Sequence, residues 1–215
     1  MYEFVRGPLT WVAFIVFVGG MTYRIVSLIL LSRKKDPVVY NHLSLSWSLR
    51  SIFHWLLPFN RTVTQYPVYS FFAYVFHFCL LLLPIFLLAH NILWYESWQI
   101  RWWSLPESLA DYLTMVVLAC IVFLIVRRTV LPYVRIVTTG MDYFLLIVVA
   151  LPFLTGLIAY HQWWEYRWML ILHMLSGQLM LVLIPFTKLS HMAFFFLTRA
   201  HIGSEFGERR GTVTW

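Results

Sequence analysis

Charged residues are scarce in this chain of 215 residues: Asp, Glu, Lys and Arg together make up 12% of it, against 61% hydrophobic residues. The mean hydropathy is +0.75. A single water-soluble core could not bury so many apolar side chains, whereas lipid accepts them. The composition therefore argues against a soluble globular domain and predicts an integral membrane protein.

Cysteine is nearly absent as well. The two cysteines, Cys79 and Cys120, lie in separate apolar segments, and the sequence has neither a CxxC nor a CxxCH motif. This pattern argues against covalently attached haem c, an iron–sulfur cluster and a zinc site. The chain also lacks the pattern of a Ser/His/Asp triad, a glycine-rich phosphate loop or a paired-carboxylate hydrolase site. Chemistry on this chain would therefore have to come from a cofactor.

Aromatic residues, in contrast, are abundant: 18 Phe, 12 Tyr and 11 Trp. They are more than the aromatic belts at the two membrane surfaces require, so many must pack inside the protein. Packing against flat cofactors and plain helix packing both explain this excess.

Five apolar runs with charged or polar ends predict five membrane-spanning helices of about twenty residues each. They cover residues 9–31, 68–93, 109–126, 142–160 and 168–187, and the last can continue as an amphipathic helix to about residue 198. The start, MYEFVRGP, precedes an apolar run that is too long for a signal peptide, which predicts a retained first helix. We expect an all-α integral membrane protein, a five-transmembrane-helix bundle that forms a single membrane domain over residues 1–215.

Positive charges are distributed unevenly between the predicted connections. With the N-terminus outside, only Arg6, Arg101 and Arg167 fall on the outer side. Twelve of the sixteen Lys and Arg residues fall on the inner side: Arg33, Lys34, Lys35, Arg50, Arg61, Arg127, Arg128, Arg135, Lys188, Arg199, Arg209 and Arg210. The positive-inside rule thus predicts an outer N-terminus and an inner C-terminus. The net charge of +7 follows from this topology and from contact with lipid, without nucleic acid.

An inner-side interfacial helix is expected in the longest inner connection, residues 36–67. The stretch SLSWSLRSIFHWLLPF within it mixes apolar and polar residues. Such a pattern is typical of a helix that lies in the membrane surface.

Four histidines lie in the predicted spans: His77 and His90 in the second, and His173 and His191 in the fifth and its extension. An ionisable side chain inside a bilayer is costly, so each needs a partner. If one helix carries both His173 and His191, their eighteen-residue separation places them on one face, roughly 27 Å apart along the axis. Because the second and fifth spans run in opposite directions, His90 matches the depth of His173, and His77 that of His191.

Each of these pairs can hold one haem iron from two sides, the bis-imidazole mode that leaves no open site for oxygen. The alternative is that the histidines bond to neighbouring helices or face a polar cavity. Four histidines at matched depths on two helices favour haem. The thirteen residues from His77 to His90 rotate the helix by roughly 220°, so these two share a face only if the helix is distorted near Pro84. His90 is consequently the weakest of the four candidate ligands.

Two further positions carry candidate roles. His161, at the outer end of the fourth span, can replace His90 as a ligand or, with Glu165 close by, accept protons from a quinol. An ordinary interfacial histidine is the plainer explanation. Arg24 suits a haem propionate, although a cation that reaches the inner surface explains it equally well.

The number of spans, the outer N-terminus and the histidine pairs together resemble the nitrate reductase gamma-subunit family of di-haem cytochromes b. SLRSIFHWLLPFNRT, LLPIFLLAHNILWYESW, VALPFLTGLIAYHQ, LILHMLSGQLMLVLIPFTKLSHM and FFFLTRAHIGSEFG are similar to one branch of it. That branch is the cytochrome b subunits of the transmembrane redox complexes of sulfate-reducing bacteria, of the Hmc, Tmc and Dsr type. The similarity covers nearly the whole chain. The second span departs from the nitrate reductase subunits, whose histidines lie closer together, which puts His90 in doubt.

The resemblance implies two haems b with His77, His90, His173 and His191 as axial ligands, and exchange of electrons with menaquinone near the outer haem. It implies a cytoplasmic iron–sulfur partner subunit of the heterodisulfide-reductase-like kind and, as a further partner, a periplasmic multihaem cytochrome c. The chain would then be the electron-transfer subunit of a quinone-linked oxidoreductase complex in a bacterial cytoplasmic membrane. The direction of electron flow depends on the potentials of these partners.

Two alternatives come from other functional classes. A haem-free membrane anchor would only dock a soluble complex, and its histidines would be replaceable. A small transporter or proton channel would use the histidines as a relay. It would need more internal acids than Asp111 and Asp142, which both lie near span ends.

Overall fold

The computed structural model describes residues 1–211, in which helices predominate and no strand occurs. Helices make up 84% of these described residues. Five of them are long and apolar enough to cross a membrane: Tyr2–Lys35, Pro67–Phe86, Glu107–Val130, Gly140–Tyr160 and Tyr166–Phe186. The prediction of an all-α membrane protein with five spans is confirmed. The chain is a multi-pass membrane protein.

The chain divides into two compact units, each assembled from two separate stretches. Unit 1 combines Met1–Arg6 with Pro67–Gly177, and unit 2 combines Gly7–Tyr66 with Gln178–Trp215. Each unit is described by itself. The expectation of a single membrane domain stays a prediction.

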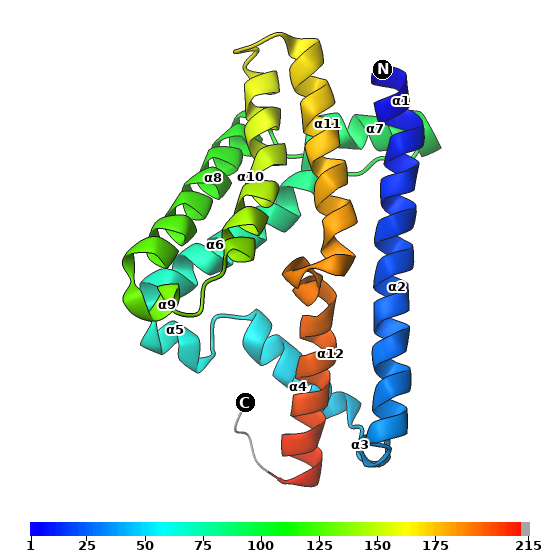
Figure 1. The fold of residues 1–215 in the computed structure, drawn as a ribbon, viewed down its shortest axis with the longest axis vertical. Helices are drawn as coiled ribbons and strands as arrows, with labels where there is room; N and C mark the ends of the chain where they lie inside the picture. Colours follow the sequence, from blue (N-terminus) through cyan, green and yellow to red (C-terminus); the bar gives the residue numbers. More distant parts are fainter. Residues whose placement is uncertain (212–215) are drawn as a thin grey trace. The chain divides into compact units, whose positions relative to one another are not determined.

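Unit 1 is built around α8, which packs against both α6 and α10 (Figure 1). Its elements are α1 (Tyr2–Phe4), α6 (Pro67–Phe86), α7 (Leu88–Trp98), α8 (Glu107–Val130), α9 (Pro132–Arg135), α10 (Gly140–Tyr160) and most of α11 (Tyr166–Leu183). The first turn of α8 carries Glu107 and its last turn Arg127 and Arg128. These charges suit the two ends of the helix dipole. α10 begins at a capping box in which Thr139 and Asp142 bond to each other's backbone N–H groups.

The second predicted span is not one continuous helix. α6 ends at Phe86, Leu87 is extended with ψ of 131°, and α7 begins at Leu88. Pro84, in the last turn of α6, has no N–H group to continue the helical bonding. The prediction of a single helix over residues 68–93 is therefore wrong at its C-terminal end, and His77 and His90 lie on different helices.

Leu83 O still accepts the last helical bond of α6, from Leu87 N at 3.0 Å. The three carbonyl groups after it lose their helical partners, and each finds another donor. The donors are His90 Nδ1 to Pro84 O at 3.0 Å, Trp102 Nε1 to Ile85 O at 2.8 Å, and Leu105 N to Phe86 O at 2.8 Å. Because lipid offers no hydrogen bonds, a break in a membrane helix must be sealed by the protein in this way.

Unit 2 is built around α12, along which α4 packs. Its elements are most of η1 (Val5–Leu9), α2 (Thr10–Lys35), α3 (Val38–Asn41), α4 (Leu45–Leu56), α5 (Arg61–Gln65), the end of α11, η2 (Ile184–Phe186), η3 (Lys188–Ser190), α12 (His191–Gly203) and η4 (Ser204–Arg209). η2 packs against α2.

The fifth predicted span, residues 168–187, corresponds to the helix Tyr166–Phe186, but its expected extension to about residue 198 is interrupted. α11 ends at Leu183, two short 3-10 turns follow, and α12 begins at His191. Pro185 has no N–H group and so cannot continue the helical hydrogen bonding. After it, the Thr187 hydroxyl accepts a hydrogen bond from Leu189 N at 3.3 Å. His173 and His191 are therefore carried by different helices. The shared face expected if a single helix carries both does not apply.

α4 is the helix expected in the inner connection, and it is amphipathic. The side of α4 that carries Ser48 faces α12, where the Ser48 hydroxyl donates to Ala200 O at 3.0 Å. Gly203 lies so close to the Trp47 carbonyl that a Cβ atom there would collide with it. The opposite side of α4 exposes an apolar row at helical spacing: Leu45, Leu49, Phe53 and Leu56. This division suits a helix whose apolar side faces lipid.

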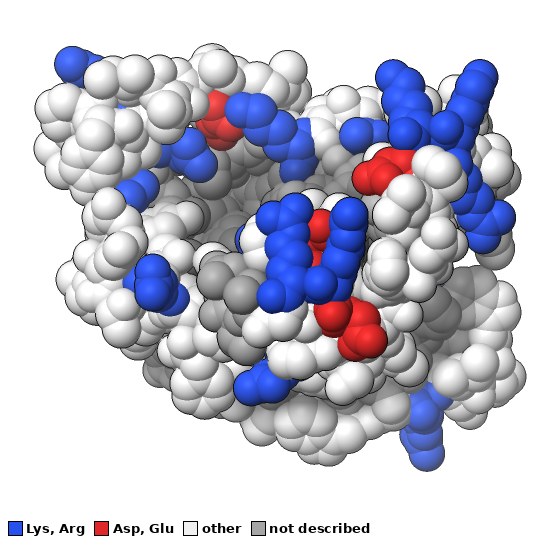
Figure 2. All heavy atoms as spheres, turned by 90° about the horizontal axis from the view of Figure 1, so that it is seen from below, with Lys and Arg blue, Asp and Glu red and all other residues white. Residues whose placement is uncertain are grey.

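Basic side chains outnumber acidic ones on the face of the molecule shown in Figure 2. In unit 2, α2 ends with Arg33, Lys34 and Lys35. The side of the membrane on which they lie stays a prediction of the positive-inside rule.

Candidate functional site

The four histidines proposed as haem ligands share one contact. In each, Nδ1 lies within hydrogen-bonding distance of a backbone carbonyl. The pairs are His77 with Ala73 O at 2.7 Å, His90 with Pro84 O at 3.0 Å, His173 with Pro152 O at 2.8 Å, and His191 with Lys188 O at 2.8 Å. A carbonyl oxygen can only accept, so Nδ1 carries the proton and Nε2 is the basic nitrogen. Imidazoles that bind a metal are commonly oriented in this way.

The remaining histidines differ from these four. His161 uses Nε2, which lies 2.9 Å from Asp111 Oδ1. Within residues 1–211, His42, His54 and His201 make no bond from Nδ1 to a carbonyl. The contact therefore separates the four candidate ligands from the other histidines of the chain.

His90 and His173 lie together in unit 1. Their ring centres are 5.9 Å apart, and the ring planes are inclined by 27°. Metal–imidazole bonds of about 2.0–2.1 Å place the centres of two rings on opposite sides of one metal ion about 6 Å apart. Both side chains are half-buried. The two rings thus have the spacing that a shared metal requires, and His90, the weakest ligand by sequence, belongs to the best-defined pair.

Helix irregularities position both rings. The break at Leu87 frees the Pro84 carbonyl that orients His90. On α10, a Cβ atom at position 156 would lie 3.1 Å from both Cε1 and Nδ1 of His173, tighter than ordinary contact. Gly156 therefore makes room for the ring beside the Pro152 carbonyl.

Small polar residues support His173 from the same two helices. Ser176 is buried and donates its hydroxyl to His173 O at 2.9 Å. The hydroxyls of Thr155 and Ser176 are 3.4 Å apart. These contacts fix α11 against α10 at the level of the imidazole.

Asn91, next to His90, was not singled out by the sequence. It is 4% exposed and binds the loop after α7 through the Ser104 hydroxyl at 2.6 Å, the Trp102 carbonyl and the Trp102 N–H at 3.2 Å. The sequence did contain a signal: Asn91 is a single amide side chain in an apolar run, and a buried amide must form hydrogen bonds. Asn91 ties the Trp-rich loop to the helix that carries His90.

His77 and His191 are exposed, and they belong to different units: His77 to unit 1 and His191 to unit 2. Their pairing around a second iron stays a prediction. No group of three or more His, Cys, Asp or Glu that could hold a metal occurs in the described part of the chain. A haem iron needs only two protein ligands, because the macrocycle supplies the others.

His161 is paired with Asp111 and not with Glu165, the partner expected from the sequence. The Asp111 side chain is 14% exposed, and the His161 ring stacks on Trp163 at 4.8 Å between centres. Glu165 instead accepts from the N–H groups of Arg167 at 3.3 Å and Trp168 at 2.9 Å, which caps the start of α11. Asp111 lies 50 residues from His161, too far for sequence spacing to connect them.

Arg24 is engaged within unit 2. Its Nη1 atom donates to Pro185 O at 2.7 Å and to the Ser190 hydroxyl at 2.9 Å. The guanidinium also lies 4.8 Å from the centre of the Phe194 ring. Pairing with a haem propionate stays a prediction.

Comparison with known proteins gives one informative relative. A protein of Nitratidesulfovibrio vulgaris (strain Hildenborough), whose printed name states no function, is 37% identical over 219 residues, which cover 100% of this chain and 97% of the relative. No family model matches the chain. No solved structure matches it either.

Proposed function

Because this chain belongs to the same family as the Nitratidesulfovibrio vulgaris protein, from a sulfate-reducing bacterium, we propose that it is a di-haem cytochrome b subunit of a membrane redox complex. It passes electrons across the bacterial cytoplasmic membrane between menaquinol and a cytoplasmic iron–sulfur subunit. A periplasmic multihaem cytochrome c is a further partner. The organism of the relative fits the resemblance to sulfate-reducer complexes.

One observation carries this proposal: the 5.9 Å spacing of the His90 and His173 rings, each with Nδ1 bonded to a carbonyl. Both imidazoles keep Nε2 for a metal, and the spacing accommodates one ion between them. The haem supplies one-electron transfer when bound. His90 and His173 would hold its iron and leave no open site for oxygen. His77 and His191 are the proposed ligands of the second haem.

His161 and Asp111 form the proposed proton-accepting end of the site. The Asp111 carboxylate accepts the Nε2 proton of His161, so that Nδ1 is the basic nitrogen. Oxidation of a quinol releases two electrons and two protons. His161 Nδ1 would take one proton from a quinol hydroxyl, and Asp111 would stabilise the imidazolium that results. The second proton would pass to water at the membrane surface, and the two electrons would leave one at a time through the haems.

The proposal is tested by counting haem b in the purified, membrane-extracted complex with the pyridine haemochrome assay. Haem c from partner subunits is counted separately. We expect two haems b per chain, and one fewer after His90→Ala or His173→Ala. His42→Ala is the matched control, because His42 lacks the carbonyl contact.

Replacing both members of a pair separates the two sites. The double variant His90→Ala/His173→Ala should lose one haem in total, because the two residues share it, and His77→Ala should remove the other. A complex without haem b would contradict the proposal and leave the haem-free membrane anchor as the better explanation.

A further inference from the structure

The link between α11 and α12, residues 184–190, is irregular. It contains two 3-10 turns, and Pro185 near its start is buried. His191 follows it directly as the first residue of α12. The geometry of residues 184–190 therefore decides where the His191 ring lies.

Two residues of α2, one helical turn apart, contact this link. At Gly20, an added Cβ atom would lie 2.8 Å from Pro185 Cβ and 2.9 Å from Pro185 Cγ, so the proline ring packs directly on the α2 backbone. Gly19, its neighbour in the sequence, has nothing within 4 Å of the same position. The close approach is thus specific to Gly20.

Arg24 bonds to both ends of the link. The same Nη1 atom donates to the Pro185 carbonyl and to the Ser190 hydroxyl. The Pro185 carbonyl lies in the 3-10 turn η2, and an unbonded carbonyl in a membrane protein is costly. Arg24 removes this cost and connects the start of the link to the residue before His191.

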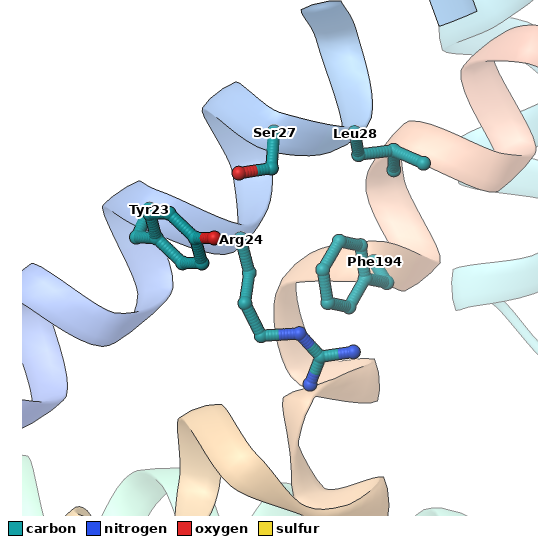
Figure 3. Close-up of a pocket in the computed structure, with 5 residues that line it drawn as sticks. All are labelled: Tyr23, Arg24, Ser27, Leu28 and Phe194. Atoms are coloured by element: carbon teal, nitrogen blue, oxygen red, sulfur yellow. The ribbon is translucent and has the colours of Figure 1, made fainter. Parts of the chain in front are cut away.

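The Arg24 guanidinium is held in place from a third direction. It lies against the Phe194 ring in the first turn of α12, as Figure 3 shows. A hollow of about 360 Å³, lined by Tyr23, Arg24, Ser27, Leu28 and Phe194, opens beside it. Within residues 1–211 Arg24 has no carboxylate partner. An arginine within a span needs such compensation, and here neutral acceptors and an aromatic face supply it.

We infer that Gly20 and Arg24 of α2 are positioning residues that fix the α11–α12 link and thereby set the orientation of the His191 imidazole. The consequence for haem binding rests on the proposed function. The effect on the link itself does not.

The test combines two readouts on the complete purified complex. Hydrogen–deuterium exchange of the peptide that covers residues 184–190 reports how firmly the link is held. The low-spin ferric EPR signal of the haem that His191→Ala removes reports the orientation of the imidazole. Arg24→Gln and Gly20→Ala are the test variants, and Arg33→Gln and Gly19→Ala on the same helix are their controls.

We expect Arg24→Gln and Gly20→Ala to speed exchange in the link, to shift this EPR signal and to weaken binding of that haem about tenfold or more, as removal of a supporting contact does in other metal sites. Arg24→Lys, which keeps a donor and the charge, should restore part of each effect. The control variants should behave as the natural protein. If Arg24→Gln does not fold, Gly20→Ala against Gly19→Ala gives the same comparison.

Unchanged exchange in the link of both test variants would overturn the inference, whatever the haem content. Faster exchange with an unshifted EPR signal would also overturn it, because the link would then not control His191. If His191→Ala leaves both haems in place, the second haem site fails. In that case faster exchange in the test variants still supports the role of Gly20 and Arg24 in fixing the link.

Discussion

The two units satisfy the carbonyl groups of their broken helices in different ways. In unit 1, an imidazole takes part in sealing the break after α6: His90 bonds to the Pro84 carbonyl, beside Trp102 and Leu105, and His173 bonds to the Pro152 carbonyl of the continuous helix α10. In unit 2, the link before α12 has bonds within itself, and the guanidinium of Arg24 bonds to the Pro185 carbonyl. An apolar chain has few polar side chains, and carbonyl groups exposed by proline must be bonded in lipid. Polar side chains such as imidazole and guanidinium are therefore found next to helix irregularities.

The two kinds of polar group differ in whether they keep a free lone pair after they have bonded to a carbonyl. An imidazole that donates through Nδ1 keeps a basic nitrogen for a metal, whereas a guanidinium has no lone pair to offer. The unit 1 pair is thus suited to bind a cofactor, and Arg24 is suited to hold the chain. Four substitutions test this comparison, beginning with the one of largest expected effect.

Asp111→Asn addresses the histidine of unit 1 that bonds to a carboxylate. Loss of the negative charge should leave both haems in place but slow quinol oxidation about 100-fold, the range for a disabled general base. Quinol-dependent haem reduction in stopped flow measures it, with Glu107→Gln at the start of the same helix as control. A rate equal to that of the natural protein would exclude His161 and Asp111 from the reaction.

Gly156→Ala alters the carbonyl–imidazole contact of unit 1. The new Cβ atom would press on the His173 ring at 3.1 Å, so the ring must shift and haem binding should weaken about tenfold. Gly177→Ala on α11 is the control, because nothing lies within 4 Å of its Cβ position. Haem titration into the haem-depleted complex measures both. Equal affinities would show that Gly156 does not position His173.

Ser190→Ala removes one of the two acceptors of Arg24 in unit 2. The Pro185 carbonyl remains, but the bond from the Ser190 hydroxyl to Thr187 O at 2.8 Å is lost as well. We therefore expect a loss of stability of about 2 kcal/mol, typical of two hydrogen bonds. Thermal unfolding in detergent against Ser27→Ala, which lines the hollow beside Arg24, measures it. Equal destabilisation by the two variants would remove the special role of Ser190.

Glu205→Gln has the smallest expected effect, because it concerns a surface ion cluster of unit 2. Desolvation acts to raise the pKa of Glu205, but hydrogen bonds from Arg210 and Arg209 and their charges lower it overall below 4.5. A lowered pKa contributes stability above the ordinary value, and this contribution is lost as the pH falls through the folded pKa. The variant should therefore lose less stability than the natural protein on acidification. Identical pH profiles of thermal unfolding would contradict this.

The sequence predicted much of this molecule because composition and hydrophobic run length act locally. A long apolar run can only be accommodated in lipid as a helix, so the class and the five spans follow without knowledge of contacts. The four candidate ligands could be named for the same reason, since each intramembrane histidine requires a partner wherever the chain folds.

The sequence suggested a distortion near Pro84 but could not show that the helix breaks at Leu87, nor that the helix of the fifth span ends before His191. Pro84 and Pro185 were visible, but proline inside a membrane helix often causes only a kink. The chain breaks at Leu87 and after Leu183, where distant donors bond the freed carbonyls. For the same reason the sequence missed Asn91, whose partners lie in a loop eleven and thirteen residues away.

By itself, then, the sequence determined that the chain is an all-α membrane protein and which of its histidines need partners, because burial of charge and apolar surface depends on residue type. Only the tertiary structure decided the pairing of His90 with His173, the exchange of Glu165 for Asp111 beside His161, and the attachment of Arg24 to the α11–α12 link. These contacts join residues that are far apart in the chain, and their formation depends on distances of a few ångströms that residue order does not contain.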